Sequence, residues 1–509
     1  MENNEKEKIN AEEALQKDIT SAPPQNESPP PEENEVNKEA REKGKNKKNG
    51  KDLFTEGSLW KNMFLFSMPL VFSQLLQVLF NMSDVAVVGK FGSADAMGSV
   101  GSTSTLVALF TGFLIGLGAG VNVKVAQFVG AKKDKDVRET VQTSFVLSLT
   151  AGIVVFLACF FLGSTMLGLL DTNAELLPGA VRYFRIYAFG MPALAVFNFG
   201  NGVLSATGDT KRPLVYLTVS GVLNIILNIF FVVVCKMQAE GVAYASIISQ
   251  YLSAVLVMIR LIRRTDSCAF SFAKMSFAPD KAKAVLVLGL SAGIQNALFS
   301  IANLFVQKSL NSFDKAVVNG NVAAANADTI VYNVMAAFYT AGATFVGQNF
   351  GAGKKERILK SYFVSLVYAL SFGLVLGLLL VVFSKQFLFL FTQSGEGVSP
   401  EEQELLMSAA TERLKIMGCS YFISSFVDSA IAASRGLGKS LVPTIALIFG
   451  TCVFRIIWIY TVFAHFHTIL SLYLLYPASW IITATFEIIY FFKVYKKIIR
   501  PRTQTAETA

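Results

Sequence analysis

The chain has 509 residues, of which 53% are hydrophobic and only 16% are charged, and its net charge is +9. A soluble domain carries about 25% charged residues, so this composition excludes an ordinary soluble protein and indicates one embedded in a membrane. At about 20 apolar residues per spanning helix, residues 59–495 have room for about twelve helices. No sizeable soluble catalytic domain fits between them.

The distribution of basic residues and cysteines excludes further classes of protein. Lys and Arg lie between hydrophobic runs instead of forming one basic surface, so membrane topology explains them better than nucleic-acid binding. The 5 cysteines are scattered and the chain has only 2 histidines. Neither a disulfide framework nor a metal site is predicted, and we expect no cofactor.

The two ends of the chain are predicted to be cytosolic tails. Residues 1–52 are rich in Glu, Lys, Asn and Pro and lack the apolar segment of a signal peptide. Such a composition does not bury enough apolar surface to fold, so we expect a disordered tail. Residues 499–509 form a second, shorter tail.

Apolar runs bounded by charge, Gly, Pro or Asn predict twelve spans. They cover residues 59–88, 95–129, 137–168, 175–206, 212–235, 240–264, 282–311, 321–350, 357–391, 402–434, 440–463 and 468–496. Alternate connections are strongly basic, and the others are acidic or nearly neutral. The basic side is the cytoplasmic side of a cell-membrane protein, which places both termini inside the cell.

The two halves of the sequence resemble each other. Residues 125–131 (VAQFVGA) match residues 346–352 (VGQNFGA) at a shift of 221, and residues 208–213 match residues 438–443 at a shift of 230. With six helices per half, both copies start on the same side and are related by an axis along the membrane normal. We therefore expect two six-helix lobes, residues 53–270 and 271–498, that face a central cleft.

Several segments resemble the multidrug and toxic compound extrusion (MATE) transporter family, in its bacterial multidrug-export branch. They are Asp84–Gly92 (DVAVVGKFG), Asn198–Thr210 (NFGNGVLSATGDT) and Asp428–Pro443 (DSAIAASRGLGKSLVP). Ser205 replaces an Arg that the family usually has, whereas Arg435 keeps its counterpart. The resemblance implies an all-α fold of twelve helices with pseudo-two-fold symmetry. It also implies a secondary antiporter that exports lipophilic organic cations in exchange for H⁺ or Na⁺.

Asp84 is the candidate ion-coupling residue, because an unpaired carboxylate inside a membrane helix costs about 2.5–3.5 kcal/mol on insertion scales. The resemblance adds Asn224, Asn228 and Ser246 to this site, and Asn198 as the counterpart of Asp428. Their oxygens suit Na⁺, but the same groups suit a carboxylate that takes up a proton. Asn228 stands where relatives often have Asp, and the missing charge favours H⁺.

Two plainer interpretations of this site stay open. Asp84 can lie near the outer end of its helix, wetted by solvent. The asparagines and the serine can serve only as interhelical hydrogen bonds, which are common in membrane bundles.

The candidate substrate site lies in the second half of the chain. Asp428 is an acid on the tenth helix, and Asp328, Tyr332, Met335 and Tyr339 form one stripe on the eighth. Gln295 lies on the seventh helix, where some relatives have an acid. An acid with aromatic neighbours attracts organic cations, and each cation–π contact contributes about 0.5–2 kcal/mol. Ordinary packing is the alternative for each aromatic residue, and Asp328 can lie at the outer mouth.

Other features receive no ligand-binding role. Lys124, Arg455 and Glu487 are charges inside apolar runs, and Lys124 and Glu487 lie near enough to the cytoplasmic end to snorkel. The glycines at 112, 116, 118 and 120 predict close helix packing rather than a phosphate loop. Pro69, Pro192 and Pro213 are candidate hinges.

Three function classes agree with a membrane protein of this size to different degrees. An antiporter, acting as a monomer on small organic cations among membrane lipids, agrees best with acids in the cleft. A flippase for a lipid-linked saccharide shares the fold, but its cleft should carry several cationic residues. A membrane enzyme is disfavoured, because the sequence has no HExxH or GxSxG motif.

Overall fold

The computed structural model describes residues 53–170, 172–389 and 399–499, all within the compact unit Gly50–Ala509. Every regular element in these ranges is helical, which confirms the predicted all-α class. The tails predicted for residues 1–52 and 499–509 lie outside the described residues, apart from Ile499.

The first half of the chain supplies six of the predicted spans. Its helices are α3 (Leu59–Phe91), α4 (Ala94–Gly130), α5 (Asp134–Leu169), α6 (Leu177–Ala188), α7 (Met191–Ala206), α8 (Lys211–Ile229) with the π-helical turn η1 (Phe230–Val234), and α9 (Gln238–Ile262). A short 3₁₀ helix, η2 (Phe272–Lys274), lies in the connection to the second half.

The fourth span is not the continuous helix that the sequence predicted over residues 175–206. It ends at Ala188 and resumes at Met191, with Pro192 in the first turn of α7. Proline has no N–H to donate to the preceding turn, so it is tolerated at a helix start and breaks a helix interior. For this reason only 11 single helices in the described residues are long and apolar enough to span a membrane, and the α6–α7 pair forms the remaining span.

The second half repeats the order with more interruptions. It contains α10 (Pro279–Leu310), α11 (Lys315–Gly351), α12 (Lys355–Val382), α13 (Ser384–Phe389), α14 (Pro400–Gly436), α15 (Leu441–Leu447), η3 (Ile448–Val453), α16 (Phe454–Trp458), η4 (Ile459–Phe463), α17 (Ala464–Phe466), α18 (Ile469–Tyr473) and α19 (Leu475–Ile499). The ninth span ends at Val382 instead of 391. The eleventh span, α15 to α17, contains two π-helical turns that the sequence pattern does not reveal.

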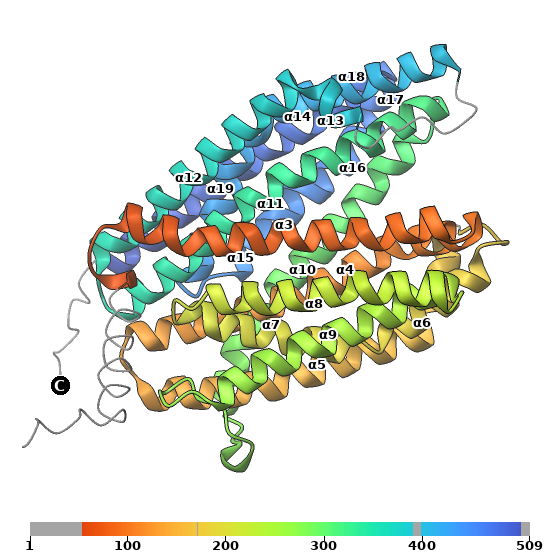
Figure 1. The fold of residues 1–509 in the computed structure, drawn as a ribbon. Coiled ribbons are helices and arrows are strands. Elements are labelled where there is room, and N and C mark those ends of the chain that lie inside the picture. Colours follow the sequence, from red (N-terminus) through yellow and green to blue (C-terminus); the bar gives the residue numbers. More distant parts are fainter. Residues whose placement is uncertain (1–52, 171, 390–398, 500–509) are drawn as a thin grey trace, which may run out of the picture. The chain divides into compact units, whose positions relative to one another are not determined.

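The helices form two groups, each with its own apolar cores. Figure 1 shows α5 to α9 on one side of α3 and α12, α14 and α18 on the other, and each group has an apolar core of its own. The first helix of each half also packs on the opposite half, because α3 contacts α11 and α12 while α10 lies along α4. The lobe limits at residues 270 and 271 stay a prediction.

Glycines allow α4 and α10 to approach backbone to backbone. A Cβ on Gly116 would lie 2.3 Å from the Gly293 nitrogen, and a Cβ on Gly120 would lie 2.4 Å from the Gly289 nitrogen. No side chain fits at such distances, so the small-residue face predicted on this helix is a helix-packing surface.

A symmetric contact joins the two halves at the end that carries the basic clusters, and we call it the basic-end contact. Gln127 Nε2 donates to the Gly436 carbonyl at 2.9 Å, and Gln348 Nε2 donates to the Ala206 carbonyl at 2.7 Å. The two glutamines occupy equal positions in the two repeats. Each contact therefore runs from one half to the last turn of a helix in the other half.

Gly130 and Gly351 complete the basic-end contact. A Cβ on Gly130 would lie 2.1 Å from the Gln348 carbonyl oxygen, and a Cβ on Gly351 would lie 1.9 Å from the Gln127 carbonyl oxygen. Both obstacles are backbone atoms, which cannot rotate away as a side chain can.

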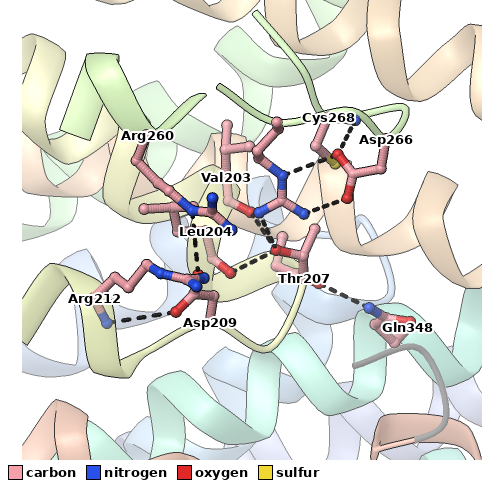
Figure 2. A network of polar contacts seen from close by, with 11 residues as sticks. Val203, Leu204, Thr207, Asp209, Arg212, Arg260, Asp266, Cys268 and Gln348 are labelled. Carbon is pink, nitrogen blue, oxygen red and sulfur yellow. Dashed lines mark hydrogen bonds and ion pairs between the residues drawn. The ribbon is translucent and has the colours of Figure 1, made fainter. Parts of the chain in front are cut away.

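Gln348 donates to the last residue of α7, and a polar network holds the turn that follows (Figure 2). Asp209 forms an ion pair with Arg212 and lies 4.0 Å from Arg260 on α9. Thr207 accepts a hydrogen bond from Arg264 at 3.1 Å. The end of α7 and the turn after it are therefore fixed to α9 within their own half and to α11 in the other half.

Gly130→Ala should weaken the basic-end contact, because overpacking against backbone costs about 1–3 kcal/mol. We expect the distance between spin labels on Lys135 and Glu356, whose side chains are 90% and 89% exposed, to lengthen in double electron–electron resonance. Gly101→Ala on the same helix is the control, because a Cβ there meets nothing within 4 Å. An unchanged distance distribution in Gly130→Ala would contradict this account of the contact.

Candidate functional site

Four polar side chains from three helices of the first half meet in one cluster, which we call the Asp84 cluster. Asp84 on α3 accepts hydrogen bonds from Asn228 Nδ2 at 2.5 Å and from Ser246 Oγ at 3.3 Å. Asn228 also donates to Asn224 Oδ1 at 3.2 Å, and Asn224 donates to Ser246 at 3.5 Å. The sequence placed these four residues in one site, and the structure brings them together.

One oxygen of the Asp84 cluster, Asn228 Oδ1, accepts no hydrogen bond among the described residues. Asn228 is fully buried, and its Oδ1 has no partner among the described residues. Amide orientations are assigned from such networks, so a rotation of this side chain would turn the unpaired oxygen toward Asp84. The cluster therefore holds both a donor and a spare acceptor for the carboxyl group.

Asp84 faces a cavity of about 450 Å³ in the first half, which we call the amino-half cavity. Asn224, Ser246 and Asn198 also line it. Asn198 donates to the Leu194 carbonyl at 2.9 Å, and no hydrogen bond joins it to Asp84. Because Asp84 is half-buried at the cavity wall, an ion that enters the cavity reaches the carboxylate directly.

The second half contains a separate cavity of about 440 Å³, the carboxyl-half cavity. Four of the predicted substrate residues line it: Gln295, Asp328, Tyr332 and Asp428. The other two predicted residues are not among its lining. Met335 is 0% exposed in the apolar core, and Tyr339 packs with its ring centroid 6.4 Å from that of Tyr332.

Asp328 is not a free acid, and it does not lie at an outer mouth. It is 5% exposed, and its Oδ2 lies 2.9 Å from Arg413 Nη2 and 3.1 Å from Arg413 Nε. A further nitrogen of this arginine donates to Asn321 at 2.9 Å. Arg413 was not predicted as a partner of Asp328, since nothing in the sequence of a single helix shows which distant acid an arginine will contact.

The expectation of a cleft lined mainly by acids was therefore wrong for this half. Arg413 and Arg455 both line the carboxyl-half cavity beside Asp328 and Asp428. Arg435 Nη2 donates to Gln295 at 2.9 Å, and among the described residues its charge acts on Asp428 without an ion pair or hydrogen bond between the two side chains. Asp428 is thus the acid of this cavity that has no ion pair within the described part of the chain.

Two charges that were expected to snorkel behave differently from each other. Glu487 is 0% exposed and neither carboxyl oxygen has a partner among the described residues, so it does not reach solvent. Lys124 donates to Gln127 at 3.3 Å and lies 4.6 Å from the Phe128 ring centre. It belongs to the basic-end contact rather than to either cavity.

The two cavities share a wall. Ala108 of α4 lines both of them, and Asn296 of α10 donates to the Gly112 carbonyl of α4 at 2.8 Å. Asn296 lines the carboxyl-half cavity and Gly112 lines the amino-half cavity. The close crossing of α4 and α10 therefore separates the two cavities.

Known proteins with similar sequences agree with this architecture. The family model MatE matches residues 69–230 and 292–461. The probable multidrug resistance protein YpnP of Bacillus subtilis is 29% identical, with 76% of this chain and 86% of that protein aligned. YoeA, another probable multidrug resistance protein of that organism, is 27% identical over 86% of this chain and 95% of its own length. A protein of Shewanella oneidensis named as an FAD transporter is 23% identical over 64% of this chain and 73% of its own length.

Solved structures show the same fold at lower sequence identity. A MOP superfamily transporter from Pyrococcus furiosus has a TM-score of 0.82 at 20% identity, covering 89% of this chain and 99% of its own. A multidrug resistance MATE family transporter in an outward-facing conformation has a TM-score of 0.79 at 20% identity, covering 87% of this chain and 97% of its own.

The family match covers most of both six-helix repeats, and the fold agrees with it over nearly the whole membrane region. Members of this family are transporters and not enzymes. This chain belongs to the MATE family of multi-pass membrane transporters.

Proposed function

We propose that this protein is a secondary antiporter of the cell membrane that expels lipophilic organic cations in exchange for H⁺. The relatives named for multidrug resistance and for FAD transport support small organic molecules as cargo. The observation that carries the proposal is Asp84, held by Asn228 and Ser246 at the wall of a cavity.

Proton coupling agrees better than Na⁺ coupling with the atoms around Asp84. In the orientation of this structure, Asn228 Nδ2 donates to Asp84 at 2.5 Å and stabilises its carboxylate form. When Asp84 takes up a proton, the unpaired Oδ1 of Asn228 becomes the acceptor that the new O–H needs. One carboxylate also provides less charge for Na⁺ than the two that many relatives have.

Exchange requires the two halves to alternate between closed and open at the basic end, which we place in the cytoplasm with both termini. The basic-end contact is formed in this structure, so it represents the state closed on that side. Each ligand shifts the equilibrium only by its difference in affinity for the two states. H⁺ at Asp84 and cargo in the carboxyl-half cavity therefore favour opposite states.

Asp84→Asn should abolish transport driven by a pH gradient, because the amide cannot exchange a proton. We would reconstitute the protein in liposomes, impose a pH gradient or a Na⁺ gradient separately, and follow a fluorescent organic cation. Asp95→Asn is the control, since it removes an exposed acid near the same helix end.

We expect the pH gradient alone to drive the parent, and Asp95→Asn to behave like the parent. A parent driven only by the Na⁺ gradient would overturn proton coupling. An Asp84→Asn variant that equals the parent in both gradients would overturn the role of this residue.

Asp428 is the proposed attraction point for cationic cargo. It lines the carboxyl-half cavity together with Tyr332, Tyr421 and Trp480, and no ion pair neutralises it among the described residues. A carboxylate in such a site attracts a cation strongly, because the surroundings screen its charge less than water does.

Asp428→Ala should weaken binding of cationic compounds by about 10-fold, the effect of losing one interaction of about 1.4 kcal/mol. Neutral compounds of similar shape should lose less than about 2-fold. Fluorescence titration of both compound types in detergent measures this, with the exposed Asp314→Ala as control. Equal losses for cationic and neutral compounds would show that Asp428 is structural.

The Asp328–Arg413 pair is proposed to hold the cavity wall rather than to bind cargo. Removing one partner of a buried ion pair leaves an uncompensated charge and costs about 3–5 kcal/mol. We expect Arg413→Gln to lower the melting temperature in detergent, and a second substitution, Asp328→Asn, to restore most of the loss. A double variant as unstable as Arg413→Gln alone would contradict this role.

A further inference from the structure

Arg455 is a buried cation for which the described part of the chain offers no carboxylate partner. Its side chain lies on α16, is 1% exposed and lines the carboxyl-half cavity. Nη1 donates to Asn303 Oδ1 at 3.2 Å, and Nε has no partner among the described residues. An unpaired charge inside a membrane protein is costly, and such a residue usually marks a ligand or ion path.

Aromatic rings hold the guanidinium but leave its Nε without a hydrogen-bond acceptor. The guanidinium carbon lies 4.5 Å from the Tyr476 ring centre and 5.6 Å from that of Phe299. Stacking of this kind fixes the plane of the group and offsets part of its charge. It supplies no oxygen acceptor, so an Arg nitrogen remains available to a ligand.

Arg455 and its neighbours lie on the helices of the second half that correspond to those of the Asp84 cluster in the first half. In the first half, the Asp84 cluster joins the first helix (α3), the fifth helix (α8) and the sixth helix (α9). In the second half, Asn303, Arg455 and Tyr476 join the corresponding helices α10, α16 and α19. The shift of 230 residues also places Tyr476 at the counterpart of Ser246.

The two groups differ in the sign of their charge, and the charged residue lies on a different helix of the repeat in each: Asp84 on the first helix (α3) and Arg455 on the fifth (α16). One has a carboxylate with amide and hydroxyl neighbours, which suits a proton or cation. The other has a guanidinium with an amide and an aromatic neighbour, and a guanidinium matches the oxygens of a carboxylate or phosphate.

The other charges of the cavity do not neutralise Arg455. Asp328 forms an ion pair with Arg413, with its Oδ2 2.9 Å from Arg413 Nη2. Asp428 lines the same cavity, but no ion pair joins it to Arg455. The cavity therefore presents an acid and a base at separate points of its wall.

We propose that Arg455, Asn303 and Tyr476 form an anion subsite that binds the carboxylate or phosphate group of an aromatic compound. Together with Asp428, this subsite extends the cargo from simple cations to amphoteric molecules that carry a basic and an acidic group. The inference rests on the proposed function in taking this cavity as the cargo site.

The test uses a matched pair of dyes, rhodamine 110 with a free carboxylate and rhodamine 123, its methyl ester. Fluorescence polarisation with the full-length protein in detergent measures the Kd of each dye. We expect Arg455→Gln to weaken binding of the carboxylate dye by about 10-fold, as for one lost charged hydrogen bond. The ester should change by less than about 2-fold, which also shows that the variant is folded.

A second variant and two competing anions test whether the loss of binding comes from the charge and shape of Arg455. Arg455→Lys keeps the charge without the planar fork and should retain part of the preference for the carboxylate dye. Benzoate and phenyl phosphate should displace that dye from the parent but not from Arg455→Gln. Equal losses for both dyes, or no loss for either, would overturn the anion subsite.

Displacement by farnesyl phosphate at concentrations where phenyl phosphate has no effect would overturn the assignment to aromatic cargo in favour of a lipid phosphate. The assay contains no ion gradient, so its outcome does not depend on how transport is driven. A failure of proton coupling at Asp84 is thus distinguishable from a failure of this subsite.

Discussion

The structure depends on backbone-to-backbone contact between helices of different halves. At the basic end, Gly130 and Gly351 each lie against a carbonyl of the opposite half, and Gln127 and Gln348 donate across the same boundary. A membrane gives helices little hydrophobic reason to associate, so close van der Waals packing and hydrogen bonds must do it. Such contacts are either fully made or lost, since a gap of about 1 Å already forfeits much of the attraction. This favours two discrete arrangements of the halves over a continuous range.

The internal repeat gives the two halves the same order of helices, but the polar residues in their cavities differ. Gln127 and Gln348 make equivalent hydrogen bonds in the two halves. A symmetric contact between the halves at the basic end requires the same side chain on each side. The cavities need no such equality. The group on the first, fifth and sixth helices contains a carboxylate, Asp84 on the first helix, in the first half, whereas in the second half it contains a guanidinium, Arg455 on the fifth helix.

Local signals in the sequence predicted most of the spans, whereas the resemblance to the MATE family implied that Asn224, Asn228 and Ser246 belong with Asp84. Apolar length defines a span, and the i, i+4 spacing of Asn224 and Asn228 puts both on one helix face. The sequence marked Pro192 as a candidate hinge but predicted a continuous fourth span, and its pattern did not reveal the π-helical turns η3 and η4. It also missed the Asp328–Arg413 pair, whose partners are 85 residues apart, since the pairing of buried charges follows from three-dimensional packing and not from composition.

If the proposed ligands occupy both cavities, the wall between the cavities offers a short physical route by which one ligand would influence the other. Asn296 borders one cavity and Gly112 borders the other, and a single hydrogen bond of 2.8 Å joins them. The glycine pairs of α4 and α10 lie next to this bond along the same helices. A ligand that moves either helix changes both cavities at once, because neither helix has space to shift alone. Coupling is then a property of one rigid crossing whose equilibrium both sites bias, which is the physical requirement for linked binding at two sites.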